Sequence, residues 1–428
     1  MSAFDRIIGY RSEKDELIRL CDVLKHPDKY QKLGVRLPSA ILLYGDPGLG
    51  KTLFAKALIE ESGLPCFPCR KDSSDGHFVE AIKKTFEKAA ENAPSIVFLD
   101  DMDKFAEDNL QKDSNKEEFA TIQTCMEQVQ DKRVFVIATA NDIDYLPESL
   151  MRAGRFGRNI KFTSPSDSDA AEIVRYYLHG KPISKELSAE TIAKILYKKS
   201  CATLEEIVNE AGILAGHENS VEISRDHILR AILKVLFNII PTTDLAVSRK
   251  RLFISYHEAG HAVVALALGQ KVGIVTSHKG AKLEGVCTEQ PLDSTYLTFN
   301  DVLRDSTVSL GGKAAVALHF GEADVGCSKD IDDAVQIIRP AITRTCAVGF
   351  EYGHDHDLGF EFQQPPVLID RISNKLYKIV EMCYNNALQI LERNKELLEA
   401  IAAELQKRPA LLSDDLDRIL SEHPIRKE

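Results

Sequence analysis

The chain has 428 residues, which is more than one hydrophobic core usually serves, so two or three domains are expected. Its formal net charge of -11 argues against general nucleic-acid binding, which needs a basic surface, and its 44% apolar and 28% charged residues are typical of soluble domains. No run of about 18 apolar residues predicts a membrane span, and the charged start lacks an apolar leader. We therefore expect a cytoplasmic protein without a membrane span.

Short apolar runs alternate with amphipathic patterns over the first 163 residues. They cover residues 40–44, 95–99, 134–139 and 159–162. Runs of this length between helical patterns predict buried strands of a parallel sheet, and polar residues follow them where open α/β sheets bind ligands. Residues 1–163 are thus predicted to form an α/β domain.

A glycine-rich loop follows the first of these runs and fits the pattern G-x-x-x-x-G-K-[ST]. It consists of Gly45, Asp46, Pro47, Gly48, Leu49, Gly50, Lys51 and Thr52. The glycines allow a tight loop whose backbone N–H groups point at phosphate. Lys51 is expected to reach the β- and γ-phosphates of ATP, and Thr52 to bind Mg²⁺.

Polar residues at the ends of the later runs complete this predicted site. Asp100 is placed to hold the Mg²⁺ shell and Asp101 to orient the attacking water, although either carboxylate could instead cap a helix. Asn141 is placed to touch the γ-phosphate or that water. Arg155 and Arg158 belong to an arginine cluster suited to stabilising a transferring phosphoryl group, or else to a solvated surface.

The rest of the chain is mainly helical by pattern. Residues 164–240 show apolar residues at helical spacing and predict a small helical domain, with a linker at 241–244. Residues 245–428 are also mainly helical, apart from a β-like stretch at 273–287. A long amphipathic region at 372–405 predicts two helices.

A second motif, H-E-x-x-H, begins at His257. His257 and His261 are four residues apart and so share one face of a helix, where their ring nitrogens can converge on zinc. Glu258 is placed to take a proton from water at the metal. The alternative is a buried histidine pair with other partners. Catalytic zinc needs a third protein ligand, which the residues alone do not identify.

Together these motifs resemble the FtsH family of AAA ATP-dependent zinc metalloproteases. The resemblance rests on the motifs at 45–52, 96–103, 138–141, 149–158 and 257–261, on their order, and on the opening residues 4–9. It implies an AAA ATPase module, with a parallel-sheet core (1–163) and a helical lid (164–240), followed by a mainly helical zinc metalloprotease domain (245–428). It also implies Zn²⁺, ATP and Mg²⁺ as cofactors.

The resemblance assigns further residues and partners. Ile8 and Gly9 would lie near adenine, while Arg155 and Arg158 would reach a neighbouring subunit's ATP in a hexameric ring. The segment 328–331 resembles the family's S-N-D-I stretch, which makes Asp330 the third zinc ligand, with Asp332 and Asp333 as rivals. The segment 311–315 resembles a helix that packs behind the zinc site. The substrates would be polypeptides.

Three features depart from the family pattern. The family carries a membrane anchor before the ATPase, and none is predicted in this sequence, so we expect either a soluble relative or a truncated chain. The family's aromatic pore loop is shortened at 72–78, where His77 or Phe78 substitutes unless Phe78 starts a core helix. Asp101 replaces a glutamate, which predicts slower ATP hydrolysis. We predict an ATP-dependent zinc endopeptidase that unfolds or translocates proteins. The alternative is an AAA remodelling ATPase or scaffold with a weak or vestigial protease.

Overall fold

A computed structural model describes most of the chain in two compact units. The described residues are 2–71, 78–105, 115–152, 154–196, 198–239, 249–277, 286–290, 298–322, 325–349, 366–408 and 410–427. By their contacts the residues divide into Met1–Ser224 and Arg225–Glu428. The predicted linker at 241–244 and the residue His77 lie outside the described residues, and the predicted domain boundaries stay a prediction.

A parallel five-stranded sheet forms the centre of the first unit. The strands are β1 (Ala40–Tyr44), β2 (Cys66–Cys69), β3 (Ser95–Leu99), β4 (Val134–Ala140) and β5 (Asn159–Lys161). Their order is β2-β3-β4-β1-β5, and every neighbouring pair is parallel. Both faces of β3 and β4 are buried, as continuous apolar runs predict. The sheet also contains β2, a strand that the sequence pattern did not predict.

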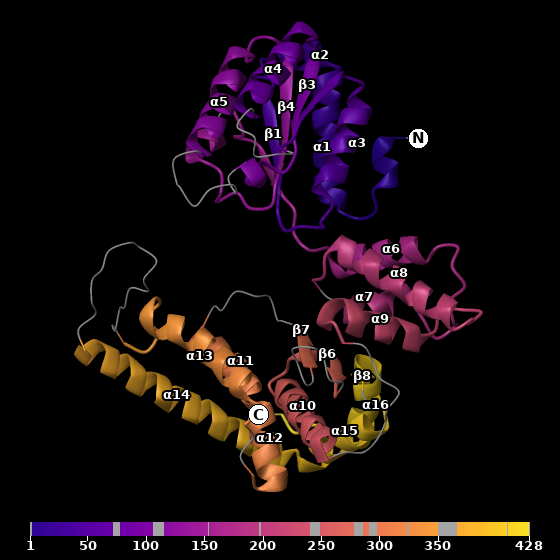
Figure 1. Cartoon of the computed structure of the whole chain (residues 1–428), viewed down its shortest axis with the longest axis vertical. Coiled ribbons are helices and arrows are strands. Elements are labelled where there is room, and N and C mark those ends of the chain that lie inside the picture. The colour runs from indigo at the N-terminus through magenta and orange to yellow at the C-terminus, as the bar shows by residue number, and fades with distance from the viewer. Residues whose placement is uncertain are drawn as a thin grey trace. The chain divides into compact units, whose positions relative to one another are not determined.

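Helices cover both faces of this sheet (Figure 1). On one face lie α1 (Arg11–Lys25) and α3 (Lys51–Ser62), and on the other lie α4 (Phe78–Glu91) and α5 (Asn115–Gln128). The short helices are η1 (Ala3–Arg6), α2 (Pro27–Gln31), η2 (Met102–Phe105) and η3 (Glu148–Met151).

Phe78 begins α4 and belongs to the core of the first unit. Its side chain is 8% exposed, and its ring lies 4.8 Å from the ring of Phe105, centroid to centroid. Of the two interpretations of Phe78, the structure therefore supports core packing.

The first unit ends in helices that are capped by serine side chains. These helices are α6 (Asp167–Leu178), α7 (Ala189–Ile195) and α8 (Cys201–His217). The hydroxyls of Ser166, Ser188 and Ser200 each accept a hydrogen bond from a backbone N–H in the first turn. Such caps satisfy donors that have no partner inside the helix, so the helix starts are encoded locally.

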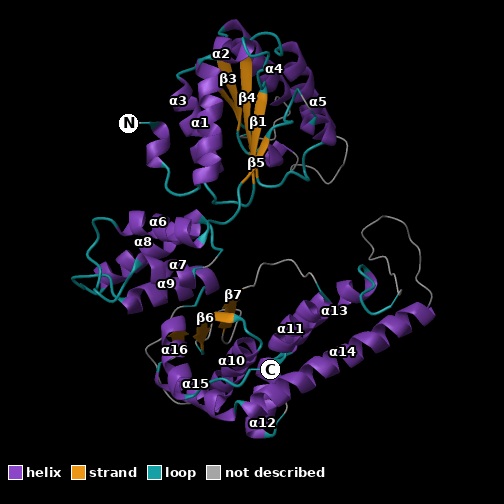
Figure 2. Ribbon diagram, turned by 180° about the vertical axis from the view of Figure 1, so that it is seen from behind, coloured by secondary structure: helices purple, strands orange, loops and turns teal. Residues whose placement is uncertain are grey.

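The second unit is built around the buried helix α10 (Arg249–Ala267) (Figure 2). Its other helices are α9 (Arg225–Phe237), α11 (Phe299–Ser309), α12 (Gly311–Phe320), α13 (Ser328–Thr343), α14 (Pro366–Arg393), α15 (Lys395–Lys407) and α16 (Ser413–Glu422). Small residues line the contact between α10 and α12, including Gly260, Gly311 and Ala315. The two predicted helices of the 372–405 region are α14 and α15, which are separated at Asn394.

A small antiparallel sheet packs beside α10. Its strands are β6 (Lys271–Thr276), β7 (Val286–Gln290) and β8 (Ala410–Leu412), in the order β7-β6-β8. The β-like stretch predicted at 273–287 therefore overlaps most of β6 and the start of β7, and its middle, 278–285, lies outside the described residues. The third strand comes from the far end of the chain and joins the sheet to α16.

Asp415 stabilises this end of the second unit through several polar contacts. Its carboxylate, which is 8% exposed, accepts a hydrogen bond from the backbone N–H of Leu412 at 3.1 Å. It also pairs with Arg225 at 3.1 Å and with Arg408 at 3.2 Å. Burial alone would raise the pKa of Asp415, but the Leu412 N–H and the two guanidinium groups outweigh it, so the pKa lies below its ordinary value.

We predict that Asp415→Asn lowers the free energy of unfolding at pH 7 by roughly 1–3 kcal/mol, because an amide cannot accept all of these donors. Since the folded state lowers the pKa of Asp415, its contribution is complete above the unfolded value of about 3.9 and is lost as pH falls further. The difference between Asp415→Asn and the wild type should therefore shrink below about pH 4. Urea unfolding at several pH values measures it, with exposed Asp417→Asn as the matched control. Equal losses in both variants would contradict this role.

Candidate nucleotide and metal sites

The predicted phosphate loop joins β1 to α3 and depends on its glycines. Gly45, Gly48 and Gly50 have φ angles of 139°, 79° and 90°, in the region that favours glycine. A Cβ on Gly45 would lie 2.0 Å from the carbonyl oxygen of Phe162, next to β5. The loop backbone therefore passes too close to the sheet for any side chain at this position.

Lys51 is the first residue of α3 and is 6% exposed. Its ammonium donates to the carbonyl oxygens of Gly45 at 2.5 Å and Asp46 at 2.8 Å, and to Asn141 Oδ1 at 3.0 Å. Burial lowers the pKa of Lys51, although four nearby carboxylates, Asp103 foremost, favour its charged form. The structure thus joins Lys51 and Asn141, which are 90 residues apart in the sequence.

Oxygen atoms suited to Mg²⁺ gather beside this lysine. Thr52 Oγ1 donates to Asp100 Oδ1 at 3.1 Å, and Thr139 Oγ1 donates to the same oxygen at 2.8 Å. Carboxylate and hydroxyl oxygens are hard ligands of the kind that Mg²⁺ prefers. The pairing of Thr52 with Asp100 at the carboxyl end of the sheet fits the predicted Mg²⁺ site.

Asp101 lies beside the same edge in a left-handed backbone conformation, with φ at 57°. Its backbone N–H donates to Thr139 Oγ1 at 2.9 Å. Its carboxylate pairs with Lys104 at 2.9 Å and lies 3.7 Å from Arg70. Two cations thus face the carboxylate that is predicted to orient water, and that role stays a prediction.

Asn141 follows β4 and is bound on its other side by Asp103. The backbone N–H of Asn141 donates to Asp103 Oδ1 at 3.0 Å, and its Nδ2 donates to Asp103 Oδ2 at 2.6 Å. Asp103 was not among the predicted site residues. It lies within the motif at 96–103, but its link to Asn141 depends on how η2 folds over the end of the sheet.

The two predicted arginines make contacts within the chain. Arg155 donates to the Ser149 carbonyl oxygen and to Glu127, and Arg158 donates to Glu16 at 3.1 Å. Their predicted role at a neighbouring subunit's ATP stays a prediction.

The residues predicted near adenine lie in the first unit close to α6. Ile8 is half-buried, and Gly9 has φ at 73°, where a Cβ would meet Asp169 at 3.0 Å. The next residue, Tyr10, donates from its hydroxyl to the carbonyl oxygen of Thr163 at 2.8 Å. These contacts place the predicted adenine-binding residues against the start of the helical segment.

The start of α8 touches the phosphate loop directly. The backbone N–H of Ala202 donates to the carbonyl oxygen of Gly48 at 3.1 Å, and a Cβ on Gly48 would meet Ser200 Oγ at 2.9 Å. The helical segment and the α/β segment therefore meet at the loop that is predicted to hold ATP.

In the second unit, His257, His261 and Asp330 form a cluster that could hold a metal ion. Their ligand atoms all lie within 4.8 Å of one another. His257 Nε2 is 3.1 Å from His261 Nε2 and 3.1 Å from Asp330 Oδ2, and His261 Nε2 is 3.6 Å from the same oxygen. The structure thus brings the H-E-x-x-H histidines of α10 to the carboxylate in the first turn of α13.

The surroundings of this cluster favour a metal. His261 Nδ1 lies 2.8 Å from the Val308 carbonyl oxygen, and an N–H donated there leaves Nε2 with the lone pair that a metal needs. Asp330 Oδ2 is buried and, although near both rings, accepts no well-directed hydrogen bond. Two imidazole nitrogens and one carboxylate are the donor set of a three-ligand catalytic zinc site.

A glycine keeps the centre of the cluster open. A Cβ on Gly312, in α12, would lie 2.6 Å from the Nε2 atoms of both His257 and His261. Nearby, a Cβ on Gly260 would meet the Gly311 carbonyl oxygen at 2.4 Å. The segment 311–315 therefore packs directly against the predicted metal site, as the resemblance implied.

The charges in the cluster are coupled. Burial alone would lower the pKa of His261, but Asp330 and Glu258 outweigh it and the pKa lies above its ordinary value. Burial would raise the pKa of Asp330, but the two imidazoles outweigh it and the pKa is lowered. An anionic Asp330 is the form that binds a cation.

Glu258 is buried beside the ligands, with an exposed fraction of 5%. It directly follows His257 and precedes His261 by three residues in α10. A shielded carboxylate next to a metal site can serve as a general base. This is the position that the H-E-x-x-H motif predicts.

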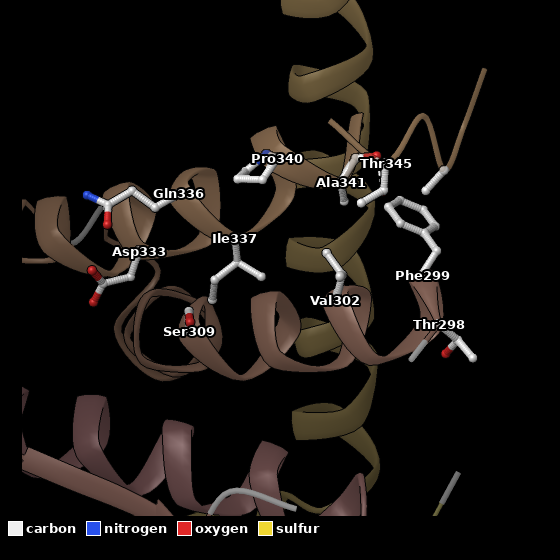
Figure 3. Close-up of a pocket in the computed structure, with 11 residues that line it drawn as sticks. Thr298, Phe299, Val302, Ser309, Asp333, Gln336, Ile337, Pro340, Ala341 and Thr345 are labelled. Carbon is white, nitrogen blue, oxygen red and sulfur yellow. Dashed lines mark hydrogen bonds between the residues drawn. The ribbon is translucent and has the colours of Figure 1, made fainter. Parts of the chain in front are cut away.

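A groove of about 810 Å³ lies between α11 and α13, beyond the first turn of α13. Figure 3 shows Phe299 and Val302 on one side, and Asp333 with Ile337 on the other. Asp333 was a rival of Asp330 as the third ligand. Its side chain lines this groove, and within the described residues the cluster takes its carboxylate from Asp330.

We predict that Gly312→Ala lowers zinc affinity at least tenfold while the chain stays folded, because the new methyl group displaces the ends of two imidazole rings rather than backbone. Competition with a chromogenic chelator and the thermal midpoint measure the two effects. Gly216→Ala, on α8 with nothing within 4 Å of its Cβ, is the matched control. Unchanged zinc affinity in Gly312→Ala would show that the metal lies elsewhere.

Two protein-family models match the chain. The ATPase family associated with various cellular activities (AAA) matches residues 41–164, and Peptidase family M41 matches residues 245–419. The first match contains the phosphate loop and the second contains the histidine cluster. AAA membership indicates oligomeric assembly. None of the helices in the described part of the chain combines the length and apolar character that crossing a bilayer requires.

Curated relatives match over nearly the whole chain. An ATP-dependent zinc metalloprotease FtsH from Aster yellows witches'-broom phytoplasma is 32% identical over 440 residues, which cover 98% of this chain and 64% of the relative. FtsH from Lachnoclostridium phytofermentans is 30% identical, covering 96% and 74%, and FtsH 3 from Symbiobacterium thermophilum is 30% identical, covering 98% and 72%. The chain thus spans less than two thirds of the length of the phytoplasma relative. With both motif sets placed in their expected folds, the chain belongs to the FtsH family of ATP-dependent zinc metalloproteases.

Proposed function

We propose that this chain hydrolyses ATP at the phosphate loop and uses that energy to unfold or translocate polypeptides, whose peptide bonds it cleaves at the histidine cluster. The observation that carries the proposal is the convergence of His257, His261 and Asp330 on one point, with Glu258 buried beside them. The relatives are named ATP-dependent zinc metalloproteases, which supports the same chemistry here.

The peptidase half needs a metal and a base. His257, His261 and Asp330 would hold Zn²⁺, which supplies a Lewis acid that polarises the scissile carbonyl and activates water. Glu258 would take the proton from that water on a carboxylate oxygen and give it to the leaving amine nitrogen. The Val308 carbonyl oxygen would hold the His261 ring in the orientation that turns Nε2 toward the metal.

The ATPase half uses residues gathered at the end of the sheet. Lys51 would neutralise the β- and γ-phosphates once it exchanges its carbonyl partners for phosphate oxygens. Thr52 and Asp100 would hold Mg²⁺, which neutralises charge on the phosphates. Asn141, in contact with Lys51, would orient the γ-phosphate or the attacking water, and Asp101 the water itself.

Assembly into a homo-hexameric ring belongs to the same proposal. In such a ring Arg155 and Arg158 would exchange their pairing with Glu127 and Glu16 for the ATP of a neighbour. The contact between Gly48 and Ala202 would pass changes at the phosphates to the helical segment.

The alternative of a remodelling ATPase with a vestigial protease fits the site less well. A site that no longer catalyses does not require three convergent ligands, an oriented imidazole and a glycine where a methyl group would strike both rings. The geometry favours an intact peptidase.

We predict that Glu258→Gln lowers the rate of casein degradation by a factor of about 100 or more and leaves ATP hydrolysis intact, because the amide cannot accept the proton. The measurement is release of labelled peptides with ATP and without it. Lys51→Ala, which should lose ATP-driven degradation while retaining zinc, serves as the second arm.

The outcome of each arm is decisive. Equal degradation by the Glu258→Gln chain would refute the assignment of the base. Degradation of casein at one rate with and without ATP would refute the coupling of cleavage to ATP hydrolysis. Bound zinc is measured in both variants, so that a lost metal is not mistaken for a lost base.

A further inference from the structure

We propose that Asp103 is the positioning residue that sets the orientation of the Asn141 amide, and so keeps Asn141 Oδ1, rather than Nδ2, toward Lys51 and the phosphate loop. The inference rests on the proposed ATP hydrolysis and assigns a role that the predicted site residues did not include.

The fold brings Asp103 to this place through the sheet. The strands β3 and β4 are parallel neighbours, with Leu99 paired to Ala138, so their carboxyl ends lie side by side. After β3 the chain turns into η2, which carries Asp103, while Asn141 directly follows β4. Asp103 is 6% exposed, so its carboxylate is committed to contacts within the protein.

The carboxylate binds Asn141 at two points. Asp103 Oδ1 accepts the backbone N–H at 3.0 Å, and Oδ2 accepts the side-chain Nδ2 at 2.6 Å. One bond fixes the backbone and the other fixes the side chain, so both side-chain torsions of Asn141 are restrained. A cap that served the backbone alone would leave the amide free to turn.

The orientation matters because the two ends of an amide differ in chemistry but hardly in shape. Asn141 Oδ1 accepts a hydrogen bond from Lys51 Nζ at 3.0 Å. If the amide turned over, Nδ2 would face the lysine ammonium, donor against donor, and Oδ1 would face a carboxylate. A carboxylate, which only accepts, therefore excludes the reversed amide.

The charge of Asp103 also reaches Lys51. Among the carboxylates near that lysine, Asp103 does most to favour the charged ammonium. Asp103 thus acts on both partners of the Lys51–Asn141 contact, through a direct hydrogen bond to one and through charge on the other. A misplaced catalytic group can cost roughly a hundredfold in rate, which sets the scale of the expected effect.

The test is a swap of the two side chains in the full chain. Asp103→Asn leaves an amide that can accept only one of the two N–H groups, and Asn141→Asp sets two carboxylates against each other. The double variant, Asp103→Asn with Asn141→Asp, restores the pattern. Its amide at position 103 accepts the backbone N–H and donates to the carboxylate at position 141, whose other oxygen faces Lys51. Steady-state ATPase kcat and KM are measured for all four chains, with binding of a fluorescent ADP analogue.

We expect each single variant to lose roughly 10–100-fold in kcat with KM and ADP affinity changed less than about threefold, and the double variant to recover at least tenfold over both. Asp142→Asn, a neighbour with the same charge change, should stay near wild type. An unchanged kcat in Asp103→Asn, or a double variant no faster than the singles, would overturn the inference. If Asp103→Asn does not fold, the inference is tested by comparing kcat of the double variant with kcat of Asn141→Asp.

The same assay separates this inference from the proposed function. A wild-type chain that does not hydrolyse ATP would refute the proposed ATPase. A wild-type chain that does, with Asp103→Asn equally fast, would refute only the role of Asp103.

Discussion

The close approach of α10 and α12 is the constraint on which the metal site depends. Gly260 and Gly311 touch backbone to backbone, and Gly312 leaves the space in which the rings of His257 and His261 meet. Val308, near the end of α11 and three residues before Gly311, lies behind His261 with its carbonyl oxygen 2.8 Å from Nδ1. The zinc chemistry thus rests on packing between small residues, which carry no chemistry themselves.

The sequence predicts most of the fold of the first unit, and the reasons are local. Three of its five strands are largely apolar runs, and a loop with the spacing of Gly45 to Thr52 requires a strand before it and a helix after it. The strand β2 is missed because Cys66 to Cys69 is short, contains a proline and is only partly buried. Its pairing with β3 is a tertiary event that no local pattern encodes.

The site residues likewise divide into those that a local sequence pattern predicts and those that only the fold brings together. His257 and His261 are predictable because a spacing of four residues sets them on one helix face, and Glu258 is predictable from the H-E-x-x-H motif. Spacing alone does not choose Asp330 over Asp333, since the choice depends on which side of the first turns of α13 faces the histidines of α10. The sequence patterns do not predict the roles of Asp103, Thr139 and Gly312, because their partners lie on other helices and strands. A pattern along the chain does not show which distant segments come into contact. Residues that position other residues are therefore identified only from the structure.

Zinc held by two histidines and one carboxylate of this chain, with one position left open, would be recognised by X-ray absorption at the zinc edge of the metal-loaded chain. We expect imidazole scattering from two histidines, nitrogen and oxygen neighbours at about 2.0–2.2 Å, and no sulfur shell. A sulfur neighbour at about 2.3 Å, which would point to Cys327 three residues before Asp330, or the absence of imidazole scattering, would contradict it.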